Sequence, residues 1–110
     1  NWAHAAAEPH QTTVRRSIQV RCTGTQIIFL PPPGGAGKPI AIEWAGDPVQ
    51  VVDSVALQVR NRIASWGMAI NNGHWQPVLD VEVTPDGERR FADLVAFFEQ
   101  SGIEVRRRVR

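Results

Sequence analysis

The alternation and spacing of apolar residues in residues 74–110 constrain the fold of this chain most. Apolar and acidic residues first alternate with the period of a strand that buries one face: Leu79, Asp80, Val81, Glu82 and Val83. Apolar residues then fall at i, i+3, i+4 and i+7, which is one stripe of an amphipathic helix: Phe91, Leu94, Val95 and Phe98. Gly102 ends this helix, and a second alternating run follows it. The segment therefore predicts strand, helix and strand.

Three further strands are expected before this segment. Alternation predicts a strand over residues 14–22, and the turn signal Thr23-Gly24 joins it to a second strand over 25–30. The run PPPGGAGKP at residues 31–39 interrupts regular structure, because proline cannot donate to a strand ladder. The third strand covers residues 40–44, with Ile40, Ile42 and Trp44 on its buried side.

A long helix is expected between the third and fourth strands. Asp47 followed by Pro48 is typical of a helix N-terminus, and Gly67 is typical of a C-terminus. Its apolar stripe comprises Val52, Val55, Val59, Ile63 and Trp66, with Ala56 filling in. Residues 68–75 are predicted to form a loop, and Asp86-Gly87 to form a turn whose aspartate caps the last helix.

The element order β-β-β-α-β-α-β predicts an α+β fold. We expect a two-layer sandwich, with two helices on one face of a four- or five-stranded mixed sheet and a charged opposite face. The last two strands should be parallel, which puts the acidic residues of one beside the arginines of the other. Residues 13–110 would form one domain and residues 1–12 a leader.

Composition narrows the class of protein. The chain has 110 residues, 43% of them apolar, and a net charge of +1, so no strong overall field attracts nucleic acid or lipid. Cys22 is the single cysteine and excludes an intramolecular disulfide framework. No apolar run approaches the roughly 18 residues of a membrane span. Because the chain begins at Asn1 rather than Met, we expect it to be a piece of a longer protein.

No catalytic, cofactor or metal site emerges from the motifs. The loop around Gly37-Lys38 fails as a phosphate loop, because Pro39 follows the lysine and a strand follows the loop. The histidines lack metal-ligand spacing, and the densest carboxylates fit a strand face and a turn. These residues are His4, His10 and His74, and Asp80, Glu82, Asp86 and Glu88. Cys22 has no nearby histidine and is expected to be a buried strand residue.

The C-terminal arginines are the one concentrated basic feature. Arg106, Arg107, Arg108 and Arg110 are the candidate contacts for a partner or a polyanion. They lack the interleaved aromatic residues that stack on bases, so a solvated sheet face accounts for them as well. Arginines of the first hairpin would extend the patch if that hairpin lay alongside: Arg15, Arg16 and Arg21.

A resemblance to a known family rests on a few residues of these elements. They are Val81-Glu82-Val83, Asp86, Phe91 and Gly102-Ile103, with residues 47–67 matching an earlier helix. In these residues the chain resembles the extracytoplasmic domain of the bacterial ExbD/TolR proteins, partners of proton-driven envelope motors. The resemblance implies a domain without an active site that dimerises and contacts the cell wall or other envelope proteins. It also implies an upstream transmembrane helix that this chain does not include.

The sequence thus favours a non-catalytic accessory or interaction domain of a larger protein, with an envelope location. It would act by self-association or by binding a protein partner, through the open sheet face or an edge strand, with residues 14–22 and 104–109 as candidate surfaces. The alternative is binding of nucleic acid or anionic lipid by the C-terminal arginines. An enzyme site shared with another domain would need His74, Asp86 and Glu88 to line one pocket. No cofactor is expected, and membrane contact only through a segment outside this chain.

Overall fold

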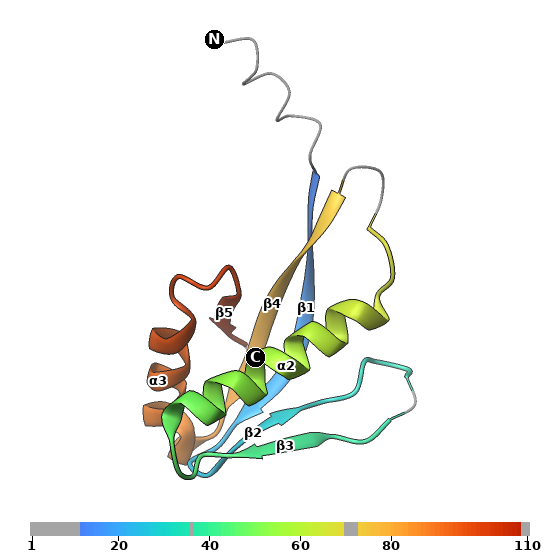
Figure 1. Cartoon of the computed structure of the whole chain (residues 1–110). Coiled ribbons are helices and arrows are strands. Elements are labelled where there is room, and N and C mark those ends of the chain that lie inside the picture. Colours follow the sequence, from blue (N-terminus) through green and yellow to red (C-terminus); the bar gives the residue numbers. More distant parts are fainter. Residues whose placement is uncertain (1–11, 36, 70–72, 109–110) are drawn as a thin grey trace, which may run out of the picture.

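The structure is a computed structural model that describes residues 12–35, 37–69 and 73–108 (Figure 1). The predicted leader apart from Thr12, residues 70–72 of the predicted loop, and Val109 and Arg110 of the predicted C-terminal surface lie outside the described residues. The elements follow the predicted order β-β-β-α-β-α-β. They are β1 (Thr12–Cys22), β2 (Gln26–Phe29), β3 (Ile40–Glu43), α2 (Pro48–Ser65), β4 (Gly73–Val83), a 3-10 turn (Pro85–Gly87), α3 (Glu88–Phe98) and β5 (Glu104–Arg107).

The strands form one mixed five-stranded sheet in the order β3-β2-β1-β4-β5. β2 is antiparallel to both β1 and β3, whereas β4 is parallel to both β1 and β5. The predicted parallel pairing of the last two strands is confirmed. It sets Asp80 directly beside Arg106.

Both helices lie on the same face of the sheet (Figure 1), and the core fills the space between the two layers. The sheet contributes Ile18, Val20, Cys22, Ile27, Phe29, Leu79 and Val81, and the helices contribute Val51, Val55, Val59, Leu94 and Phe98. The two-layer α+β architecture predicted from the sequence is confirmed.

Helix α2 begins and ends where its cap signals predict. One carboxylate oxygen of Asp47 accepts a hydrogen bond from the backbone N–H of Val49 at 2.9 Å, and Pro48 occupies the first turn. Gly67 follows the C-terminus with φ of 74°, a conformation that residues with a side chain rarely adopt. Val55 and Val59 are buried as predicted and Val51 is buried as well, whereas the predicted stripe residues Val52, Ile63 and Trp66 are half-buried.

Two more apolar residues are more exposed than their spacing predicts. Val95 in α3 is 38% exposed and Ile40 in β3 is 44% exposed. Both lie at the margin of the layered core, where spacing alone indicates the buried side but not how far the partner layer extends. The predictions for these two positions are wrong for that reason.

Strand β4 begins earlier than predicted. Residues 73–75 were expected in a loop, yet Gly73 pairs with Thr12 and the parallel register continues from there to Val83. The partner strand therefore extends β4 beyond its own alternating pattern. Pro77 is tolerated inside the strand because β5 joins β4 only from Val78 onward, so its missing N–H interrupts no ladder to β5.

The prediction that Asp86 caps α3 is wrong. Gly87 is the N-cap residue of that helix, and no side chain caps it. The Asp86 carboxylate instead accepts a hydrogen bond from the Thr84 hydroxyl at 2.5 Å and one from the backbone of Gly24. These hydrogen bonds, that of Thr84 first, lower the pKa of Asp86. The aspartate thus joins the 3-10 turn to the β1–β2 turn.

Candidate functional site: the open edge of β1

The two halves of β1 have different neighbours. β4 pairs with the whole strand, from Thr12 to Cys22. β2 pairs only with residues 20–22, and its last contact is a 2.9 Å hydrogen bond from the Leu30 N–H to the Gln19 carbonyl. Residues 12–18 therefore have a neighbour on one side only. Figure 1 shows this part of β1 and β4 projecting as a two-stranded ribbon.

The prolines that follow β2 explain why this edge is open. Val20 faces Phe29, so a longer β2 would set Pro31 against Ile18 and Pro33 against Arg16. Residues 31–33 are three consecutive prolines, and Pro32 falls opposite Ser17, where a residue of β2 would have to donate its N–H to β1. The chain turns away at this point, with a 2.9 Å hydrogen bond from the Gly35 N–H to the Pro32 carbonyl. Among the described residues, no backbone hydrogen bond satisfies the outer side of residues 12–18.

The other edges of the sheet are shorter or less accessible. The outer strands β3 and β5 have four residues each. The ribbon part of β4 contains Pro77, and the Gln76 side chain beside it donates a 2.6 Å hydrogen bond to the Gly102 carbonyl. The edge of β1 is the longest in the part of the chain that the structure describes. Of the two predicted surfaces, β5 is an edge strand, whereas β1 is an edge only from Thr12 to Ile18.

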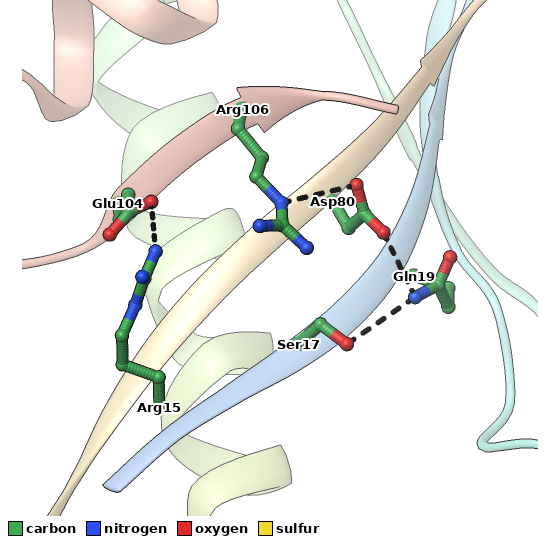
Figure 2. Close-up of polar contacts among 6 residues, drawn as sticks. All are labelled: Arg15, Ser17, Gln19, Asp80, Glu104 and Arg106. Carbon is green, nitrogen blue, oxygen red and sulfur yellow. Dashed lines mark hydrogen bonds and ion pairs between the residues drawn. The ribbon is translucent and has the colours of Figure 1, made fainter. Parts of the chain in front are cut away.

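The open face of the sheet carries a network of paired charges (Figure 2). The Arg106 Nε lies 3.5 Å from the Asp80 carboxylate, whose other oxygen accepts a hydrogen bond from Gln19 at 3.3 Å. On the same face, Arg15 and Glu104 form an ion pair at 2.5 Å. The predicted charged face is therefore confirmed, and its arginines have acidic neighbours on the adjacent strands.

This network covers an apolar residue. Val78 is 3% exposed, yet it does not belong to the core beneath the helices. It lies beside Ser17 and Glu104 in the strand register, on the face that carries the ion pairs. Long charged side chains on this face can cover it with their apolar stems. A further pair, Arg21 with Glu82 at 3.5 Å, extends the network.

The C-terminal arginines within the described residues do not all lie on one face of the sheet. Arg106 points to the open face, whereas Arg107 forms an ion pair with Glu88 and lies 5.2 Å from the Phe91 ring on the helix side. Arg108 is exposed and forms no ion pair among the described residues. The pairing of Arg106 and Arg107 compensates part of the positive charge, and polyanion binding stays a prediction.

A cluster of arginine and tryptophan lies on the helix side of the ribbon. The Arg16 guanidinium lies 4.9 Å from the Trp66 ring and 5.6 Å from the Trp75 ring, and the two rings meet edge to face at 5.3 Å. Trp75 is anchored by a 2.8 Å hydrogen bond from its indole N–H to the Gly67 carbonyl. Arg62, one turn before Trp66, donates a 2.9 Å hydrogen bond to the Leu30 carbonyl.

Sequence reasoning did not find this cluster. Arg16 lies between Val14 and Ile18 among the alternate residues of β1 that face the helices. A charged residue at a position where apolar residues are expected was the available signal. The register places Arg16 on the side of α2 rather than on the open face, so it does not extend the C-terminal arginines. Arg15 and Arg21 do lie on the open face, each paired with an acidic residue.

The carboxylates and histidine that an enzyme site would need are not brought together. His74 lies in β4 rather than in a loop, with its Nε2 atom 3.3 Å from the Thr13 hydroxyl. Asp86 follows the opposite end of the same strand, roughly 30 Å away at the usual rise per residue. Glu88 is engaged by Arg107.

Cys22 is buried, as predicted. Its side chain is 0% exposed, and burial raises the pKa of the thiol to about 11. Among the described residues, no group of three His, Cys, Asp or Glu side chains is arranged to hold a metal ion. None of the described helices has the length and apolar character needed to cross a bilayer.

Comparison of the chain with family models, curated proteins and solved structures gave no match.

Proposed function

We propose that this domain is a non-catalytic interaction module that binds by strand addition at residues 12–18 of β1. The observation that supports the proposal is the edge left open where residues 31–33 turn β2 away. An incoming extended segment would pair with the N–H and C=O groups that point away from β4. The added segment would belong to a protein partner or to a second copy of the chain. An envelope role and kinship with the ExbD/TolR proteins remain part of this proposal and rest on the resemblance alone.

The proline run offers a direct test, because it can be changed without touching β1. In the variant P31V/P32T/P33V, residue 32 regains the N–H that would donate to Ser17, so β2 can continue along β1 and cover the edge. The probe is a blocked seven-residue peptide of alternating Thr and Val, and binding is followed through the backbone amide NMR signals of β1.

The wild-type domain should show peptide-dependent shifts concentrated in residues 12–18, and the proline variant should show none. A matched peptide with proline at alternate positions should not bind the wild-type domain, because it lacks the donors. If the seven-residue peptide left residues 12–18 unchanged, and the domain showed no self-association through them in sedimentation, the proposal would be wrong.

The alternative function is polyanion binding by the C-terminal arginines, and exposed Arg108 is the observation that favours it. It predicts binding to single-stranded DNA or anionic vesicles that weakens steeply with salt. The variant R106S/R107S/R108S/R110S should abolish such binding. Absent or salt-insensitive binding would remove the alternative and would leave strand addition untouched.

A further inference from the structure

We propose that the segment added to β1 is acidic, with a carboxylate on its helix-facing side that contacts Arg16 and Arg62. The inference rests on the proposed strand addition and names the chemistry of the partner. It follows from the charges on the two sides of the open edge, which differ.

The helix side of the edge has arginines without acidic partners. Among the described residues, Arg16 forms neither an ion pair nor a hydrogen bond through its side chain, and it is held by the rings of Trp66 and Trp75. Arg62 donates to the Leu30 carbonyl and likewise has no acidic partner within that part of the chain. Burial, and then the positive charge of Arg16, lower the pKa of Arg62. The two guanidinium groups therefore form a local excess of positive charge.

The open-face side of the same strand is already compensated. Arg15 is paired with Glu104 and Arg21 with Glu82. Side chains of an added strand alternate between the two faces, so only its helix-facing residues would meet the uncompensated arginines. A carboxylate there can accept two hydrogen bonds from one planar guanidinium, which is among the stronger polar contacts available.

Arg16 lies opposite the position that one residue of an added strand would occupy. In the extended register, the place opposite Arg16 is the one that Pro33 would occupy if β2 continued. Arg62 reaches the carbonyl of Leu30, the residue at which β2 leaves the sheet. The two arginines thus come from β1 and α2, and both lie on the helix side of the open edge.

A second copy of the chain fits this position less well. Residues 12–18 read TTVRRSI and contain no acidic residue, so two β1 edges paired with each other would bring arginines together. The charge complementarity favours an extended acidic segment of a different sequence.

Three blocked peptides of seven residues test the inference. They share an alternating Thr/Val framework and differ only at the central helix-facing position, which is Glu, Gln or Lys. Binding constants are measured by calorimetry, and the amide signals of residues 12–18 report where each peptide binds. We expect the Glu peptide to bind roughly tenfold more tightly than the Gln peptide. The Lys peptide should bind most weakly.

Variants of the chain identify the residues responsible. In R16Q/R62Q the preference for Glu over Gln should disappear, while both peptides still shift the β1 signals. The matched control R15Q changes the neighbouring arginine on the opposite face and should keep the preference. Arg16→Glu should reverse it in favour of the Lys peptide, a result that a purely structural role of Arg16 would not give. In the wild-type domain, added salt should reduce the preference, and this readout needs no variant.

The outcomes separate the inference from the proposed function. If no peptide shifts residues 12–18, strand addition itself fails. If the Glu and Gln peptides bind there equally well, or if the preference survives in R16Q/R62Q, the edge binds strands but the acidic partner is wrong. Dimerisation of the wild-type domain that blocks the edge to all three peptides would overturn the inference in favour of a second copy.

Discussion

The two parts of β1 differ in how they are paired and packed. Residues 19–22 lie between β2 and β4 and contribute Val20 and Cys22 to the core, and Ile18, at the end of the open edge, also belongs to it. Residues 12–17 lie in the two-stranded ribbon and contribute no residue to the core. A two-stranded ribbon alone is at best marginally stable in water. The packed part of β1 is held on both sides, whereas the ribbon part leaves the backbone groups of one side unpaired among the described residues.

The largest expected difference between the packed part of the sheet and the ribbon is in the free-energy cost of removing an apolar side chain. Leu79 of β4 is 0% exposed and belongs to the core, so Leu79→Ala should reduce the free energy of unfolding by about 2–5 kcal/mol. Val14 in the ribbon is half-buried, and Val14→Ala should cost less than about 1 kcal/mol. Urea unfolding of both variants measures the difference. Similar losses would show that the ribbon is as tightly packed as the core.

The alkaline limit of stability should depend on the core residue Cys22. Burial raises the pKa of its thiol from 9.0 to about 11, so the folded state disfavours the thiolate. The resulting stabilisation is complete below pH 9 and falls by about 1.4 kcal/mol per pH unit between pH 9 and 11.

Few other groups titrate in that range, because the chain has no tyrosine and one lysine. Unfolding measured from pH 8 to 11 should show this decline in the wild-type domain and a flatter profile in Cys22→Ala. The same decline in both proteins would assign the effect to another group.

The smallest expected effect concerns the paired charges on the open face. Arg106 and Asp80 are 53% and 14% exposed in their side chains, and pairs of this kind contribute about 0–1 kcal/mol. Arg106→Ser should therefore reduce the free energy of unfolding by less than about 1 kcal/mol, part of it through the exposure of Val78. A double-mutant cycle with Asp80→Asn separates the ion pair from the covering of Val78. A coupling well above 1 kcal/mol would mean that this face is a stabilising core of its own.

The features that local chemistry determines could be predicted from the sequence. The helix signals at Asp47 and Gly67 act within one turn of the chain, and the alternation of residues 79–83 depends only on which face is buried. Both are visible without knowledge of the tertiary structure. The element order and the layered architecture follow from them.

The candidate site could not be predicted in the same way, because it depends on pairing between distant segments. The start of β4 at Gly73 is set by Thr12, far away in the sequence, and the role of Asp86 by Gly24 in another turn. The proline run was recognised as a break. Which strand it leaves uncovered depends on the sheet order, which the alternation pattern does not specify. The Arg16 cluster requires the position of α2 as well.

Amide hydrogen exchange along β1, measured on the domain at low concentration, tests the central claim most directly. Backbone groups of residues 20–22 are paired on both sides, and their amides should exchange slowly, near the rate set by global unfolding. Within residues 12–18, the amides that point away from β4 should exchange orders of magnitude faster than those that point toward it. Uniform slow exchange along the whole of β1 would contradict the account, because it would show that the edge is already covered.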